Sequence, residues 1–226
     1  MPNIRNVDNI ELVPVLTLEP STFSKPERRM PDDPAAWQQH WLDSLADSGI
    51  EGLKPIRESF THVATTEFSE PKVLQRVLFK LFDRWGGLEN LLDPECNPVL
   101  SGGLALCSAG ELLMEPQCCS DLANLSEWQD AVQYQGDQWK MLWIGHPWLM
   151  IRFWKGRYEL ESHEEGKVTP VDLWSVGADD LRKAVIDARA EQQRFACAMA
   201  PLLPLYGLTG PPKALSEQLA GLGSQL

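Results

Sequence analysis

The chain has 226 residues, 43% of them hydrophobic and 23% charged, a composition typical of a folded protein and not of a disordered one. Its 32 acidic and 20 basic residues give a formal net charge of −12, which argues against a nucleic-acid-binding surface because phosphates require concentrated positive charge. No apolar stretch is long enough to cross a membrane, and the first ten residues lack the apolar core of a signal peptide, so we expect a cytoplasmic protein.

The first part of the chain is predicted to be an extended arm. Residues 1–32 contain five prolines, with one short strand expected over residues 11–18. Asp33 and Pro34 then resemble an N-cap followed by proline at the first helical position. We therefore predict an arm over residues 1–32 and a single α+β domain over residues 33–226.

Two longer helices are predicted from apolar periodicity. The first begins near Ser69 and ends at Gly86-Gly87, with apolar residues on one side and Lys72, Arg76, Lys80 and Arg84 on the other. The second begins at Asp179-Asp180, whose charges suit a helix N-terminus. A shorter helix is expected over residues 126–133, with Ser126 as its cap.

Hairpins are predicted in the middle of the chain. Residues 99–107 and 111–115 form one candidate pair of strands. Residues 139–144, 148–154 and 157–163 follow, and the two-residue link Lys155-Gly156 fixes the register of the last two. That register places Arg152 opposite Glu159 on one face of the sheet. The elements together predict an α+β fold, a mainly antiparallel β-sheet with helices packed on one face, in a single domain.

The excess of acidic residues is concentrated in one segment. Residues 85–139 contain no lysine or arginine and nine carboxylates. Such a segment would steer a basic partner if it folded into one surface. The residues expected to do so are Glu111, Glu115, Asp121 and Asp130.

Tryptophan supplies the second group of candidate binding residues. Five of the nine tryptophans lie between Trp128 and Trp154, and tryptophan both anchors interfaces and fills cores. The predicted register leaves open whether Trp148 and Trp154 face the core or a partner. These two residues, with Arg152 and Glu159, are the predicted aromatic and charged part of a binding surface.

Chemical motifs are scarce. The five cysteines are an odd number without metal-ligand spacing, which favours reduced thiols over a disulfide framework. The adjacent Cys118 and Cys119 with His146 could form a thiol or metal centre, but a structural role for these residues is the more common one. No nucleotide-binding or serine-hydrolase motif is present. We therefore predict no catalytic residue, no metal and no cofactor.

The segment from about residue 95 to 165 resembles bacterial immunity proteins of the SUKH superfamily. The resemblance is carried by Glu115-Pro116-Gln117-Cys118-Cys119-Ser120-Asp121-Leu122, by Trp128 and by the Trp139–Trp148 stretch. It implies a mixed α/β fold, no catalysis and a protein partner; members of that superfamily neutralise toxins. The expected function is a non-catalytic acidic binding protein that occludes a basic toxin. The alternatives are a cysteine- or metal-dependent enzyme using Cys118 or Cys119 with His146, and an intracellular scaffold or ligand sensor.

Overall fold

The computed structural model describes residues 4–57, 61–87, 98–116, 119–142, 148–163, 170–207 and 211–223, and for Trp148 only the backbone. The α+β fold and its mainly antiparallel strand pairing are as predicted, and the strands form two sheets. The chain divides into two compact units. Unit 1 comprises Met1–Pro14 and Ser101–Glu191, and unit 2 comprises Val15–Leu100 and Gln192–Leu226. The predicted boundary at residue 32 stays a prediction.

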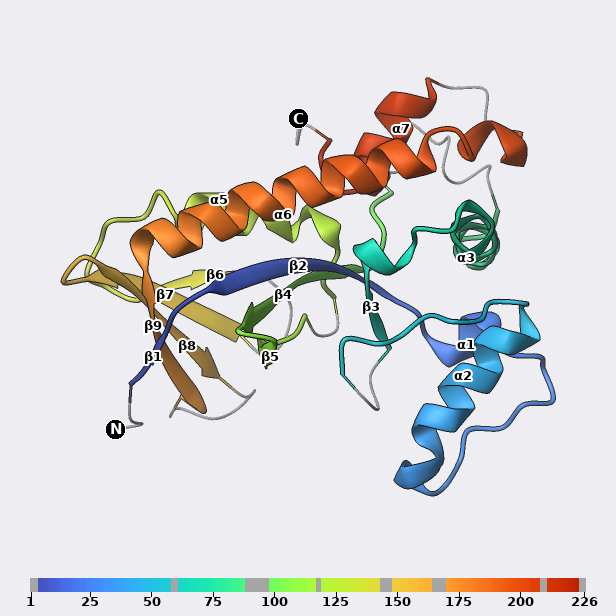
Figure 1. The fold of residues 1–226 in the computed structure, drawn as a ribbon, viewed down its shortest axis with the longest axis horizontal. Helices are drawn as coiled ribbons and strands as arrows, with labels where there is room; N and C mark the ends of the chain where they lie inside the picture. Colours follow the sequence, from blue (N-terminus) through green and yellow to red (C-terminus); the bar gives the residue numbers. More distant parts are fainter. Residues whose placement is uncertain are drawn as a thin grey trace. The chain divides into compact units, whose positions relative to one another are not determined.

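Unit 1 contains a five-stranded sheet, drawn in Figure 1. In spatial order its strands are β1 (Arg5–Val7), β9 (Asp172–Gly177), β8 (Arg157–His163), β7 (Trp148–Trp154) and β6 (Lys140–Leu142). Neighbouring strands are antiparallel except β1 and β9, which are parallel.

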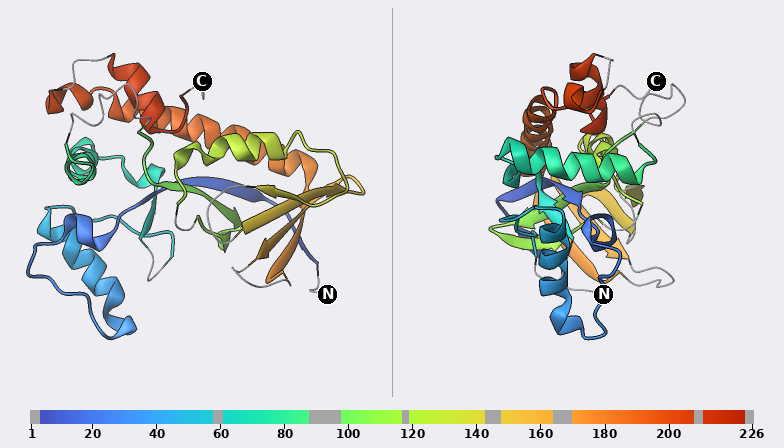
Figure 2. Two further views of the ribbon diagram at one scale, coloured as in Figure 1. Left: turned by 180° about the vertical axis from the view of Figure 1, so that it is seen from behind. Right: turned by 90° about the vertical axis from the view of Figure 1, so that its right-hand side faces the viewer.

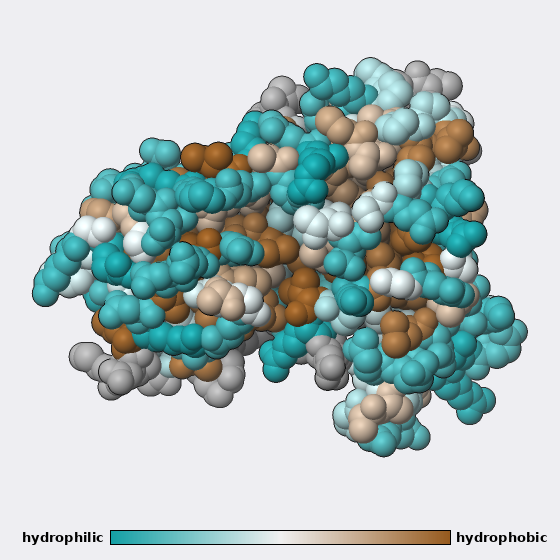
Figure 3. All heavy atoms as spheres, viewed as in Figure 1, coloured by the Kyte–Doolittle hydropathy of each residue, from teal (hydrophilic) through white to brown (hydrophobic). Residues whose placement is uncertain are grey.

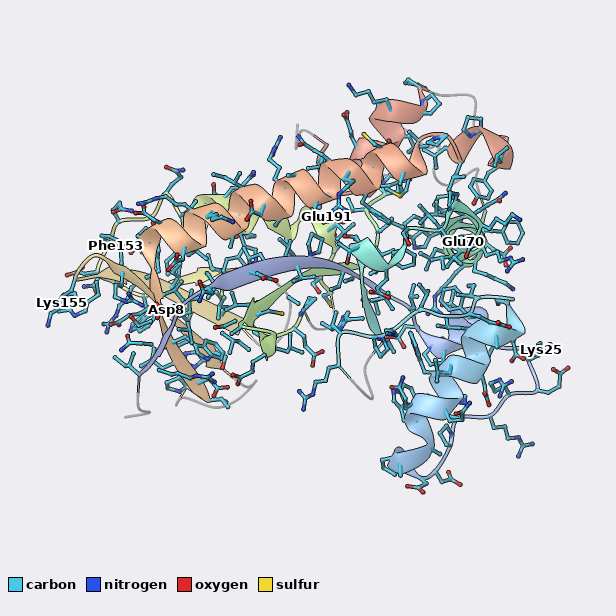
Figure 4. All side chains as sticks on the ribbon, viewed as in Figure 1. Asp8, Lys25, Glu70, Phe153, Lys155 and Glu191 are labelled. Carbon is cyan, nitrogen blue, oxygen red and sulfur yellow. The ribbon has the colours of Figure 1, made fainter. Side chains whose placement is uncertain are left out.

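The β7–β8 register confirms the prediction made from the two-residue turn. Lys155 and Gly156 have φ angles of 50° and 80°, the left-handed pair that a tight hairpin turn requires. Trp154 consequently faces Arg157, and Arg152 faces Glu159. Lys155 lies at the tip of this hairpin in Figure 4.

The helices of unit 1 cover one face of this sheet. They are α5 (Leu125–Ala131) and the first part of α6 (Ala178–Met199), which continues into unit 2. Both lie on the same side of the strands in Figures 1 and 2. Beneath them Ile151, Tyr158 and Leu160 are fully buried. The Tyr158 hydroxyl donates a 2.6 Å hydrogen bond to the carbonyl of Val132, just after α5. The outward side of α6 is mainly hydrophilic in Figure 3.

The short helix α5 begins differently from the prediction. A 3-10 turn, Leu122–Asn124, precedes it, and the Asp121 side chain accepts hydrogen bonds from this turn in a capping box. Ser126 is therefore not the cap; its hydroxyl donates to the Ala123 carbonyl inside the helical segment. Asp121 takes the capping role because it directly precedes the first turn, where the backbone N–H groups have no acceptor within the helix.

The second sheet has the strand order β3-β2-β4-β5. The hairpin β4 (Gly102–Ser108) and β5 (Glu111–Met114) belongs to unit 1 and matches the predicted pair of strands, with slightly shifted ends. Strand β2 (Ile10–Thr17) contains the boundary between the units, and its last residues pair with β3 (His62–Ala64) in unit 2.

Unit 2 is mainly helical. Its helices are α1 (Pro20–Phe23), α2 (Trp37–Asp47), α3 (Pro71–Arg84), the last part of α6 and α7 (Pro212–Leu219). Trp41 of α2 is fully buried, and its indole N–H donates to the Leu18 carbonyl. Helix α3 begins and ends as its apolar pattern predicts. Of the helices that the structure describes, none combines the length and apolar character required to cross a bilayer.

Candidate functional site

The five-stranded sheet has a second face, opposite the one that carries Ile151 and Leu160. Alternate residues of a strand point to opposite faces, so the register defines its members. We call it the outer face, and its side chains are Met141, Met150, Arg152, Trp154, Arg157, Glu159, Glu161, His163, Leu173 and Ser175. It mixes aromatic, aliphatic and charged groups.

Arg152 lies at the centre of a cation–aromatic cluster on the outer face. Its guanidinium carbon is 4.5 Å from the ring centre of Trp139 and 5.7 Å from that of Trp154. The same guanidinium donates a 2.7 Å hydrogen bond from Nε to Oε2 of Glu159, directly across the strand pair. Arginine is suited to this position because its planar group binds a carboxylate along its edge and stacks on rings with its face.

Burial distinguishes the parts of this cluster. The Glu159 carboxylate is almost inaccessible, whereas the Arg152 side chain is 28% exposed. Trp154 and Met141 are more open, at 42% and 44% exposed. The ion pair therefore holds the arginine in place, and the tryptophan and methionine leave apolar area exposed to solvent. The Trp148 backbone pairs with that of His163, but its side chain lies outside the described residues.

Two further polar contacts stabilise the outer face. Nε2 of His163 is 2.5 Å from Oε1 of Glu161. Arg157 donates from Nε to the hydroxyl of Ser175 at 2.8 Å and from Nη2 to the same residue's carbonyl at 3.0 Å. These contacts tie the polar side chains of the outer face to neighbouring residues of the same sheet.

The acidic segment is only partly available to a partner. Glu111 is ion-paired with Arg5, and that hydrogen bond lowers the pKa of the Glu111 carboxyl. Glu115 is buried, while Asp121 caps the helical turn and has its pKa raised by burial. Asp130 is exposed. Several of the described carboxylates in this segment thus make contacts within the protein itself, as an ion-pair partner or a helix cap.

The proposed thiol centre lies largely outside the described residues. Cys118 and His146 fall there, whereas Cys119 is exposed and has a left-handed φ of 67°. Cys107 and Cys197 are free thiols, and burial raises the pKa of Cys107 to about 11. Within the described ranges no three His, Cys, Asp or Glu side chains group as metal ligands do.

Sequence reasoning missed three features of the molecule. Trp139 and Met141 were not among the predicted binding residues, although both belong to the strand predicted over residues 139–144. Unit 2 also contains a shallow cleft of about 300 Å³. Its lining residues are Ser48, Gln75, Arg76, Phe79, Lys80 and Tyr206. The cationic side of α3 was the signal for this cleft, but only folding brings Ser48 and Tyr206 to that helix.

Comparison of the chain with protein-family models, with curated proteins and with solved structures finds no match.

Proposed function

We propose that this chain is a non-catalytic acidic binding protein of the cytoplasm, and that its outer face holds a protein partner. The observation that carries the proposal is the cluster in which Arg152, fixed by the buried Glu159, stacks near Trp139 and Trp154. Tryptophan and arginine are the residues that most often dominate the energy of protein interfaces.

The exposure of this cluster supports binding over a purely structural role. Trp154 and Met141 leave more than two fifths of their surface in contact with solvent. A partner that covered both would remove apolar area from water, at about 25 cal/mol for each Å². Arg152 and Glu159 need no rearrangement, so little conformational entropy is lost on binding.

The partner that we propose is a basic toxin, which makes this chain an immunity protein of the SUKH-like type. The net charge of −12 favours encounter with a cationic protein and disfavours nucleic acid. The exposed Asp130 contributes to that field. Glu115 and Asp121 are not part of the proposed contact surface, because one is buried and the other caps a helical turn.

The test starts with capture of partners from the native cell by the full chain. Each captured protein is purified, and its affinity is measured for the parent chain, for Trp154→Ala and for Met30→Ala. Loss of the tryptophan should weaken binding at least about tenfold, as expected for an interface hot spot. Met30 is the control, since it is an exposed large apolar residue of unit 2, 68% exposed.

The toxin part of the proposal has its own test. Production of the captured partner alone should arrest growth of a host cell, and co-production of the parent chain should restore growth. The Trp154→Ala chain should restore it poorly. A captured partner that is acidic, that is harmless to the host, or that binds Trp154→Ala as well as it binds the parent chain contradicts the proposal. A toxin gene beside the gene for this chain would support it.

A further inference from the structure

Helix α3 carries a cationic stripe, which consists of Lys72, Arg76, Lys80 and Arg84. Residues four apart lie above one another on a helix, about 6 Å apart along the axis. Like charges at this spacing repel one another and destabilise a helix slightly. In Figure 4 the label of Glu70 marks the end of α3 at which the stripe begins.

The stripe differs from Lys25 and Arg28 of unit 2 in having no carboxylate partner within the described part of the chain. Arg28 is paired with Asp43 and Asp47, and Lys25 is paired with Asp47. None of the four α3 cations forms an ion pair with any carboxylate in the described part of the chain. This is unexpected in a protein whose acids outnumber its bases by 32 to 20. An external anion would relieve the repulsion along the stripe.

The middle of the stripe opens into the cleft of about 300 Å³. Arg76 and Lys80 form its charged side, and none of its lining residues carries a carboxylate. The Arg76 guanidinium donates one N–H to the Gly49 carbonyl, which orients the group and leaves its other donors available. The volume is at the lower end of the range for small-molecule sites.

Two aromatic rings, those of Phe79 and Tyr206, also line the cleft. The Tyr206 hydroxyl donates a 2.6 Å hydrogen bond to the Gln75 carbonyl, and its ring meets that of Phe82 edge-on at 5.4 Å. The Phe79 ring lies 6.5 Å from that of Tyr206 and is largely exposed. Burial raises the pKa of Tyr206 to about 12, so the phenol is neutral at physiological pH and does not repel an anion.

We propose that this cleft binds a small organic anion, a phosphate or carboxylate attached to a flat ring. Lys80 and Arg76 receive the anionic group by charge-assisted hydrogen bonds. The ring packs against the face of Phe79 beside Tyr206, where offset stacking is favourable. This site lies wholly within unit 2 and is independent of the outer face, so its failure leaves the proposed function untouched.

The test uses titration calorimetry on the full chain with defined probes. Phenyl phosphate, phenylacetate and adenosine monophosphate each combine a ring with an anion, and they separate simple phosphates, carboxylates and nucleotides as classes. Inorganic phosphate supplies only the anion, and phenol supplies only the ring. We expect at least one ring anion to bind with a Kd of about 1 mM or tighter, and each half-probe to bind at least about tenfold more weakly.

Matched variants locate the site. Lys80→Gln removes the charge of an α3 lysine in the cleft, and Lys72→Gln removes that of an α3 lysine outside it. Lys80→Gln should weaken binding about tenfold, whereas Lys72→Gln should change it less than about twofold. Phe79→Ala should weaken the binding of the ring anions but leave the binding of inorganic phosphate unchanged.

Two results would overturn the proposal. One is the absence of saturable binding for all three ring anions. The other is an equal loss from Lys72→Gln and Lys80→Gln, because an equal loss would mean that the anion is attracted by the whole stripe and not held in the cleft.

Discussion

The outer face of unit 1 and the cleft of unit 2 are built from the same kinds of side chain but differ in one respect. Each sets arginine near aromatic rings. On the outer face the arginine is paired with Glu159, a carboxylate only 8% exposed, whereas no carboxylate lines the cleft. A cation with a buried partner is part of the fold, and a cation without one is available to a ligand. Charge removal should therefore have opposite consequences in the two regions.

The largest effect is expected from Arg152→Ala. The substitution leaves the Glu159 carboxylate buried without its partner, which should lower the free energy of unfolding by about 3 kcal/mol. Chemical denaturation of the purified chain measures this. The added substitution Glu159→Gln should recover part of the loss, because the uncompensated charge is then gone. A loss below about 1 kcal/mol would show that the ion pair is not an integral part of the fold.

The second largest effect is expected from Asp121, which stabilises unit 1 as a helix cap and not as the partner of an arginine. Asp121→Ala removes the side-chain acceptor of the capping box and should cost about 1 kcal/mol of unfolding free energy. Asp121→Asn keeps an acceptor, and it also removes a carboxyl group whose pKa is raised by burial. Denaturation midpoints at neutral pH should therefore place the asparagine variant close to the parent chain. Equal losses from both variants would rule out the capping role.

The third effect is a pH dependence of stability caused by Asp47. Like Glu159 in unit 1, Asp47 is a carboxylate of unit 2 that is paired with an arginine. Hydrogen bonds from Arg28 and from the Lys25 amide hold the Asp47 pKa well below its ordinary value. A lowered carboxyl pKa contributes stability that is present above the unfolded pKa, about 4, and is lost as the pH falls through the folded value. Asp47→Asn should thus lower the unfolding midpoint at pH 7 and lower it less at pH 3. A difference that stayed constant between these pH values would exclude this linkage.

The smallest effect is expected in the cleft itself. Lys80→Gln and Lys72→Gln should each change the free energy of unfolding by less than about 0.5 kcal/mol, since neither lysine has a described carboxylate partner to lose. Relief of repulsion along α3 should make the sign neutral or favourable. The same denaturation measurement provides the comparison with Arg152→Ala. If Lys80→Gln were as damaging as Arg152→Ala, the contrast between the two regions would be wrong.

Local patterns in the sequence were sufficient wherever a short turn or a helical period determined the structure. The two-residue link at Lys155-Gly156 leaves only one register for β7 and β8, so the contact between Arg152 and Glu159 followed directly. The apolar period of α3 likewise predicted which side of the helix is buried. Both features depend on residues close together in the chain.

Features that depend on distant residues were missed. Strand β1 has only three residues and pairs with β9, which lies far away in the chain, so no nearby partner identifies β1. The acidic segment shows the same limit. Its composition suggested one surface, but Arg5 pairs with Glu111, and Asp121 is used as a cap. The cleft requires Tyr206 to meet Gln75, another pairing that no local pattern contains.

The interleaving of the two units along the chain has a consequence for biosynthesis. Unit 1 begins with the first residues but is completed only by Glu191, and unit 2 begins at Val15 but requires residues beyond Gln192. A ribosome adds about 5–20 residues each second, so many seconds pass before either unit has all its parts. During that time β1 has no β9 to pair with, so the parallel pair can form only after β9 has been synthesised.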